Sequence, residues 1–138
     1  MKRKDVIKNN EISAIYEFNL GGYPQKVMIE GKSRKLPVVL FLHGGPGTPI
    51  PLSAGSRGML PAFTDKFLMV CWDQLGCGIN NREIDDSFSV DSFVQMTADL
   101  IRELRKLFRD NKIYLFATSW GSILSARLLE QYPEIVDG

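Results

Sequence analysis

The sequence has 138 residues, the size of one ordinary domain, and its 44% hydrophobic and 24% charged residues are typical of a globular protein with a buried core. The formal net charge is only +1, from 17 basic and 16 acidic residues, so composition favours neither a nucleic-acid partner nor an acidic membrane surface. We expect residues 1–138 to form a single domain or part of one.

The start of the chain and the two cysteines exclude several further classes. The basic residues 1–4 are followed by no apolar run, so we interpret them as a solvated terminus and not as a secretory signal. No stretch approaches the ~20 apolar residues that cross a membrane. Cys71 and Cys77 do not have the spacing of a redox CxxC pair and are too few for a four-cysteine metal site. We therefore interpret both as reduced thiols and expect a cytoplasmic protein without a metal.

The first part of the chain predicts a hairpin and a buried strand. Residues 12–20 and 25–30 are rich in β-forming residues, and the GGYP sequence between them is typical of a turn. Residues 36–42 form a continuous apolar run, as in a strand that is buried on both faces. Residues 43–61 are rich in glycine and proline and predict a long loop, with a short helix near Met59. Because this loop follows a buried strand directly, we expect it to be functional.

The second part alternates strands and helices. Residues 67–72 and 112–117 predict two more buried strands. Apolar residues at spacings of three and four predict a helix over 90–109, with Ser89 as its N-cap. A further helix is expected over 120–132.

This order predicts an α/β fold with a mostly parallel sheet, flanking helices and an N-terminal hairpin. Reactive groups of such sheets lie where the chain leaves the carboxyl ends of the strands. Three loops start in this way, at His43, Asp73 and Ser119, so we expect these residues to share one rim of the sheet.

Ser119 has the surroundings of a nucleophile at a strand-to-helix turn. The sequence ATSWG differs from the G-x-S-x-G elbow only at Ala117. In that turn the residues two before and two after the serine come close together, so both must be small, as Ala117 and Gly121 are. The backbone N–H of Trp120 would be one donor to an oxyanion, and we assign the second donor to Gly45 in the glycine-rich loop.

Three motifs together resemble one family. FLHGGPGTP, CWDQLGCG and ATSWGSILSARLLEQYP are similar, in order and spacing, to α/β-hydrolases of the prolyl iminopeptidase type, from about Ile12 to the end of the chain. The resemblance implies the N-terminal part of an α/β-hydrolase fold with Ser119 as nucleophile and the Gly45 and Trp120 amides as oxyanion hole. It also implies a peptide, amide or ester substrate, release of N-terminal residues from peptides, and no metal or cofactor. The supporting positions that it implies are His43, Gly44, Gly47, Asp73, Gln74 and Gly121.

The chain departs from the family pattern at four positions. Ala117 and Thr118 replace the usual glycine and histidine before the serine. Leu75 and Asn80 replace an arginine and a serine in the DQ motif. None of these changes removes the nucleophile, and together they indicate altered substrate demands.

The base and the acid of a serine triad follow the nucleophile in α/β-hydrolases, whereas the only histidine here, His43, precedes Ser119. His43 could be the base or a structural residue of the loop, and Asp73 could be an orienting acid or a structural acceptor; we favour the structural interpretation of both. Without a base the serine is a poor nucleophile, so we expect the 138-residue chain alone to be inactive.

The end of the chain, residues 134–138, is interpreted as the approach to a further strand beside residues 112–117. We therefore expect a truncated hydrolase whose strand 112–117 has an open edge, where the missing part or another chain pairs. The alternative hypothesis is a non-catalytic binding or scaffold protein that keeps the pocket without the triad. Nucleotide binding is disfavoured because HGGPG is neither a G-x-G-x-x-G nor a G-K-[ST] motif.

Overall fold

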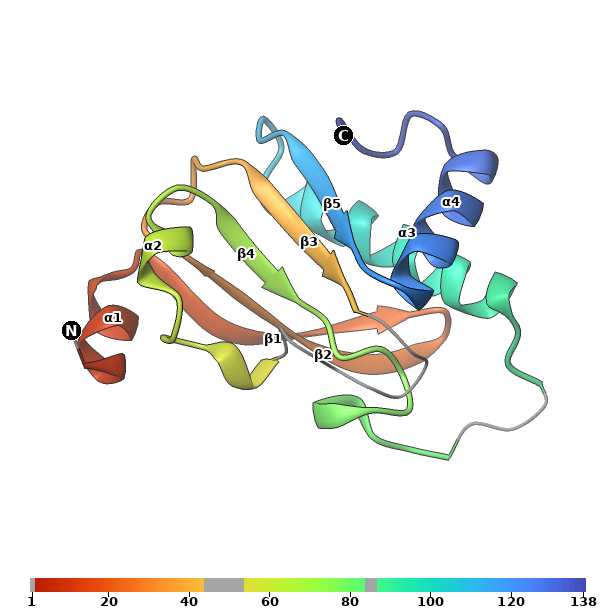
Figure 1. Cartoon of the computed structure of the whole chain (residues 1–138), viewed down its shortest axis with the longest axis horizontal. Helices are drawn as coiled ribbons and strands as arrows, with labels where there is room; N and C mark the ends of the chain where they lie inside the picture. The colour runs from red at the N-terminus through yellow and green to blue at the C-terminus, as the bar shows by residue number, and fades with distance from the viewer. Residues whose placement is uncertain (1, 44–53, 84–86) are drawn as a thin grey trace.

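A mixed sheet of five strands forms the centre of the computed structural model, which describes residues 2–43, 54–83 and 87–138 (Figure 1). The strands follow one another across the sheet in the order β1-β2-β4-β3-β5. Their bounds are β1 Ile12–Leu20, β2 Tyr23–Gly31, β3 Val38–Leu42, β4 Leu68–Cys71 and β5 Ile113–Ala117. The helices of the described part are α1 Arg3–Asn9, α2 Pro61–Thr64, α3 Val90–Leu107 and α4 Trp120–Gln131, with short 3-10 turns at Ala54–Ser56 and Gly78–Asn80.

The predicted hairpin is present, with a tighter turn than expected. β1 and β2 pair antiparallel along their whole length, down to the Leu20–Tyr23 pair. Gly21 and Gly22 alone form the loop, with φ of 59° and 88°. Two successive residues in the left-handed region match the turn twist that joins antiparallel strands, and glycine adopts it without strain. Tyr23, which the sequence placed in the turn, therefore already belongs to β2.

β3 lies between two parallel neighbours, as its uninterrupted apolar sequence predicts. It pairs with β4 from Val38–Leu68 onward and with β5 from Val38–Ile113 onward. Every residue of β3 and β4 is buried, because the sheet is covered on both faces at this point. β2 joins the other side of β4 in antiparallel register, which connects the hairpin to the parallel part of the sheet.

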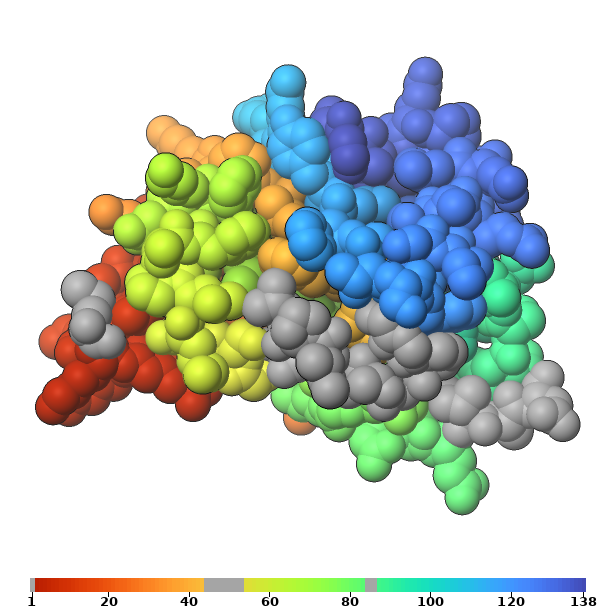
Figure 2. Space-filling view, viewed as in Figure 1, coloured from red at the N-terminus to blue at the C-terminus, as the bar shows by residue number. Residues whose placement is uncertain are grey.

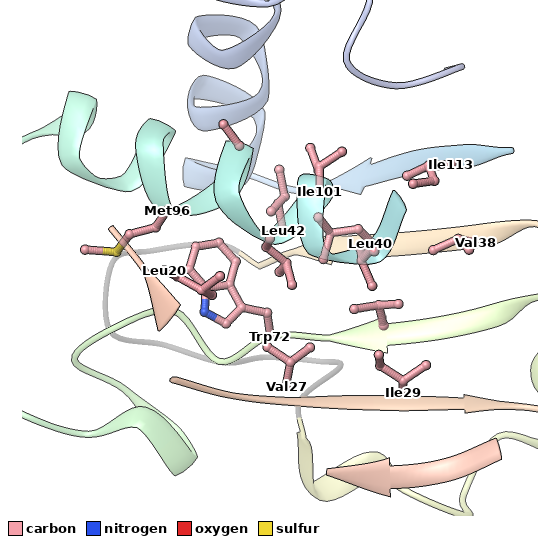
Figure 3. Packing of buried hydrophobic residues seen from close by; sticks show 14 of the residues in the cluster. Leu20, Val27, Ile29, Val38, Leu40, Leu42, Trp72, Met96, Ile101 and Ile113 are labelled. Carbon is pink, nitrogen blue, oxygen red and sulfur yellow. The ribbon is translucent and has the colours of Figure 1, made fainter. Parts of the chain in front are cut away.

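Two apolar layers cover the sheet. Helices α3 and α4 pack on one face, and Figure 3 shows Leu40 and Leu42 of β3 pointing toward Ile101 and the rest of α3. The opposite face carries a smaller cluster, in which Phe41 contacts Phe63 of α2 at 5.4 Å between ring centroids. The core therefore fixes the sheet from both sides beneath the rim where the strands end.

α3 begins where the sequence predicts and ends slightly earlier. Ser89 caps it: its Oγ accepts the N–H of Ser92, and the Ser92 side chain accepts the N–H of Ser89 in return. The helix ends at Leu107, and Phe108 leaves the helical conformation while its side chain stays buried in the core. The apolar periodicity thus continues past the last helical residue, which explains the longer predicted span to residue 109. α4 likewise ends at Gln131, one residue before its expected end.

The start of the chain is solvated, as expected, but it is also helical: Lys2, Arg3 and Lys4 are exposed. Residues 3–9 form α1, which the sequence analysis did not predict. Only Val6 of this helix is buried, so its sequence has no periodic apolar face to detect. The Arg3 guanidinium donates to the carbonyl of Arg57 at 2.7 Å and ties the helix to the segment before α2.

β5 is less covered than a buried strand. The side chain of Phe116 is 55% exposed, although its ring contacts Phe41. The outer edge of the strand is not fully open: the N–H of Asp137 donates to Ile113, and the N–H of Leu115 donates to Gly138. The expected unpaired edge is therefore partly occupied by residues 137–138. Figure 2 shows α4 and the end of β5, in blue, at the surface on this side of the molecule.

Asp137 strengthens this edge contact. Its carboxylate accepts the backbone N–H of Ile113 at 2.8 Å and the Arg105 guanidinium at 3.2 Å. Both interactions favour the ionised form, the backbone N–H most of all, and lower the pKa of Asp137 below its ordinary value.

Within the described ranges, none of the helices has the length and apolar character needed to cross a lipid bilayer. Both cysteines are free thiols in the protein interior. Burial, with the nearby carboxylate of Asp73, raises the pKa of Cys71 to about 12 and that of Cys77 to about 11.

These raised pKa values predict unreactive thiols in the folded protein. Below the raised pKa a thiol stays protonated, so at pH 8 about one part in a thousand of Cys77 is thiolate, against roughly a quarter of a free cysteine. We expect a small disulfide reagent at pH 8 to modify the native protein far more slowly than the same protein unfolded in guanidinium chloride. Modification of Cys77 at the rate of a free thiol would contradict the buried placement.

The exposed Phe116 predicts self-association of the 138-residue polypeptide. An apolar side chain on an incompletely paired edge strand favours pairing with another chain. We expect light scattering after size exclusion to give a mass above the 15.6 kDa of one chain, and Phe116→Lys to shift it toward that value. Ile15→Lys, on the opposite edge strand where Ile15 is 41% exposed, is the control and should change little. A monodisperse wild-type monomer would argue against this association.

Candidate active site

The chain leaves β3, β4 and β5 at the same rim of the sheet, and the three exits are connected to one another. The N–H of Gln74, after β4, donates to His43 Nε2, after β3, at 3.0 Å. The indole N–H of Trp120, after β5, donates to the side-chain oxygen of Gln74 at 3.0 Å. The structure thus brings His43, Asp73 and Ser119 to one rim, as the alternation of strands and helices predicts.

Ser119 occupies a strained bend between β5 and α4. Its φ of 51° and ψ of −119° make it the one non-glycine residue with positive φ among the described residues. For a residue with a Cβ atom such a conformation costs on the order of 1–3 kcal/mol, and strain of this kind concentrates at functional sites. The Ser119 side chain is exposed and caps no backbone amide of α4. Ser119 is therefore at the surface of the bend, with its side chain not used in capping α4.

Gly121 explains why the bend can be so sharp. A Cβ atom at this position would collide with the carbonyl group of Leu42, whose carbon would be 2.7 Å away, and would lie 3.0 Å from the carbonyl oxygen of His43. The first turn of α4 therefore packs directly against the end of β3. The N–H of Thr118 donates to the same Leu42 carbonyl at 3.2 Å and fixes the entry to the bend.

One amide beside Ser119 is available to an oxyanion. Gly121 and Ser122 donate to the carbonyls of Thr118 and Ser119, whereas the N–H of Trp120 has no acceptor within residues 2–43, 54–83 and 87–138. It lies at the start of a helix, where the orphan N–H groups favour negative charge. Gly45, assigned as the second donor, and its neighbours Gly44 and Gly47 lie outside the described residues.

His43 has the contacts of a structural residue. It is 3% exposed, and its Nε2 accepts the backbone N–H of Gln74, so the lone pair that a general base would use is occupied. The carbonyl of His43 accepts the side-chain amide of Gln74 at 3.3 Å. The thiol of Cys77 donates to the Gln74 carbonyl at 3.0 Å and lies 3.4 Å from His43 Nε2. These contacts fix the direction in which the chain enters the glycine-rich loop.

Asp73 likewise serves as an internal acceptor. Its carboxylate is 3% exposed and accepts the backbone N–H groups of Ala54 and Ile79, each at 3.0 Å. It therefore joins Ala54 to the loop that follows β4. No contact with Ser119 is among the interactions of the described residues, so the geometry supports the structural interpretation over that of an orienting acid.

Two of the departures from the family pattern have clear places in the fold. Leu75 is 4% exposed and packs into the main core. This position therefore offers no charged side chain to a substrate, as the arginine of the family pattern would. Asn80 exchanges hydrogen bonds of 2.7 and 2.8 Å with the backbone of Lys26 in β2 and donates to the Asp73 carbonyl at 2.7 Å. Asn80 thus fastens the loop after β4 to the hairpin, a role that its local sequence does not reveal.

Glu30 is a buried carboxylate that the sequence analysis missed. It is fully buried in β2 and accepts the N–H of Gly58 and the hydroxyl of Ser13. With Asp73, which accepts the N–H of Ala54, it holds residues 54–58 against the sheet. In the described ranges no three histidine, cysteine, aspartate or glutamate side chains gather into a metal-binding group.

The family model described as the alpha/beta hydrolase fold matches residues 37–138. "Probable aminopeptidase YbaC" of Bacillus subtilis is 35% identical over 93% of this chain and 40% of its own length. A proline iminopeptidase of Neisseria gonorrhoeae is 36% identical over 72% of this chain and 30% of its own length. A crystal structure of an epoxide hydrolase from Vigna radiata superposes with a TM-score of 0.69 and 26% identity, over 91% of this chain and 36% of that one.

The chain spans well under half the length of each of these proteins. Their names describe both peptide and epoxide hydrolysis, so similarity alone does not select the bond that is cleaved.

The packing at Gly121 predicts a sharp cost for one methyl group. Alanine favours a helix over glycine, yet its Cβ would strike the Leu42 carbonyl, and overpacking of this kind costs about 1–3 kcal/mol. We expect Gly121→Ala to lower the free energy of unfolding in urea by that amount. Ser122→Ala, one residue later on the exposed side of α4, is the matched control and should stay within about 0.5 kcal/mol of wild type. Equal stability of the two variants would refute the close approach.

Proposed function

The chain belongs to the alpha/beta hydrolase fold family, and from this premise we propose that it carries the nucleophile of a serine hydrolase that acts on peptides, amides or esters. Residues 1–138 are then the N-terminal portion of the hydrolase domain. The relatives named aminopeptidase and proline iminopeptidase support a preference for releasing N-terminal residues from peptides.

The observation that carries the proposal is the conformation of Ser119. Strain is maintained at a single non-glycine residue of the described chain, and that residue has an exposed hydroxyl at the start of a helix. A serine at an ordinary strand–helix turn would take an unstrained conformation and cap the helix with its side chain. The strained backbone conformation of Ser119 is explained if it serves to present the hydroxyl to a substrate.

In the proposed reaction, the Ser119 oxygen attacks the carbonyl carbon of the substrate. The carbonyl oxygen gains negative charge and is stabilised by the N–H of Trp120, which has no acceptor among the described residues, with the amide of Gly45 proposed as the second donor. Collapse of the tetrahedral intermediate expels the amine or alcohol and leaves an acyl group on Ser119. Water then releases the acid, and the serine is regenerated.

A general base must take the proton of Ser119, and His43 is poorly placed for this role. It is the single histidine of the sequence, and its Nε2 already accepts a hydrogen bond in the interior. We therefore propose that the base and its acid partner belong to residues outside this chain. Loss of triad members lowers turnover by about 10⁴–10⁶-fold, so the 138-residue polypeptide alone should be a poor enzyme.

Active-site labelling of the complete gene product that contains this chain tests the proposal. A fluorophosphonate probe should label the wild type and Ser122→Ala, and labelling should be lost in Ser119→Ala. Hydrolysis of a proline arylamide, a simple ester and an epoxide, measured in parallel, should show cleavage of the arylamide or ester with loss of at least about 10⁴-fold in Ser119→Ala.

A wild-type protein that takes up no probe and cleaves none of the three compounds would contradict the proposal and would favour a non-catalytic scaffold. Labelling that persists in Ser119→Ala would place the nucleophile elsewhere. Cleavage of the epoxide alone would contradict the proposed peptide, amide or ester substrate and would favour epoxide hydrolysis, the activity named for the Vigna radiata structure.

A further inference from the structure

Gln74 connects all three chain segments of the rim. It is fully buried and lies three residues after the end of β4. Its backbone N–H and its side-chain N–H groups donate to His43, at Nε2 and at the carbonyl oxygen. Its side-chain oxygen accepts the indole N–H of Trp120 at 3.0 Å. One side chain thus spans the distance between the start of the glycine-rich loop and the residue that follows Ser119.

From this bridge we infer that Gln74 is a positioning residue for the nucleophile. It holds the Trp120 side chain, and with it the first turn of α4, at a fixed distance from the His43 end of the loop. The inference rests on the proposed function of Ser119 and adds to it a residue that contacts neither substrate nor nucleophile.

The geometry of Trp120 makes this coupling effective. Its indole is held on two sides: Gln74 accepts the N–H, and the ring of Phe93 from α3 meets it edge-on, perpendicular, with centroids 6.1 Å apart. The backbone N–H of the same residue, beside Ser119, has no acceptor among the residues that the structure describes. Because both contacts hold the indole, a shift of the Trp120 backbone would have to break at least one of them, so they resist displacement of the amide and the strained bend. Displacements of about 1 Å can cost roughly 100-fold in rate.

The chain contains a matched internal control. Gln25 is also fully buried, also accepts a tryptophan indole N–H, that of Trp72 at 2.8 Å, and also donates to a backbone carbonyl, that of Leu20 at 3.2 Å. It lies in the hairpin, and although Trp72 begins the exit from β4, no hydrogen bond in the described part of the chain joins Gln25 to His43, Gln74 or Trp120. Gln25→Leu and Gln74→Leu therefore remove the same two kinds of hydrogen bond from equally buried sites. Only Gln74 contacts Trp120, the residue that follows Ser119.

The experiment compares both variants in the complete gene product. We expect Gln74→Leu to slow fluorophosphonate labelling of Ser119, and kcat with little change in KM, by about 10- to 100-fold. Gln25→Leu should lower Tm to a similar degree and leave the labelling rate near wild type. Trp120→Phe, which removes the indole N–H and keeps the backbone amide, should give a smaller loss, and the double variant Gln74→Leu/Trp120→Phe should be less impaired than the product of the two effects.

Hydrogen exchange gives a readout that needs no activity. Exchange at residues 119–122 should accelerate in Gln74→Leu and stay unchanged in Gln25→Leu. Equal slowing of labelling by both variants, or unchanged exchange at residues 119–122, would overturn the inference. If the wild-type serine takes up no probe, the proposed function fails, and the exchange comparison alone decides whether Gln74 holds the start of α4.

Discussion

The close approach of α4 to the end of β3 is the constraint on which the site depends. Gly121 brings the helix backbone against the carbonyl of Leu42, and no residue with a side chain could occupy its place without displacing one of the two elements. Since β5 is already paired with β3, the chain has only Thr118 and Ser119 in which to turn from the strand into the helix, and the positive φ falls on Ser119. The strain at that residue follows from the distance between helix and sheet.

The rest of the fold supplies the stability that maintains this strain. Leu124 and Leu128 bury the inner face of α4 against the same core that α3 covers. At about 25 cal/mol per Å² of apolar surface, each buried leucine contributes roughly 1.5–3 kcal/mol, which matches or exceeds the cost of one strained residue. Polar contacts at the rim then orient what the core has brought together. Asp73 and Glu30 hold residues 54–58, and Gln74 joins His43 to Trp120.

Local patterns in the sequence were sufficient to predict the central strands, α3 and the position of Ser119 between a strand and a helix. β3 and β4 are buried on both faces and are therefore apolar throughout, and Ser89 marks the start of α3 with its cap. α1 was not predicted because Val6 is its single buried residue, so the sequence of the helix shows no periodic pattern of apolar residues. The exposure of Phe116 depends on which segments lie beside β5. The hydrogen bond from the Trp120 indole to Gln74 joins residues 46 positions apart. Such features arise from tertiary placement, which no local pattern records.

The strand order also has a consequence for synthesis on the ribosome. β3 lies at the centre of the parallel strands, yet both of its partners come later in the chain, beginning at Leu68 and Ile113. At roughly 5–20 residues per second, a wholly apolar strand waits for several seconds before its second neighbour emerges. During that interval the nascent chain presents an aggregation-prone segment, and the early β1–β2 hairpin, which forms from adjacent residues, is the one part of the sheet that can assemble without delay.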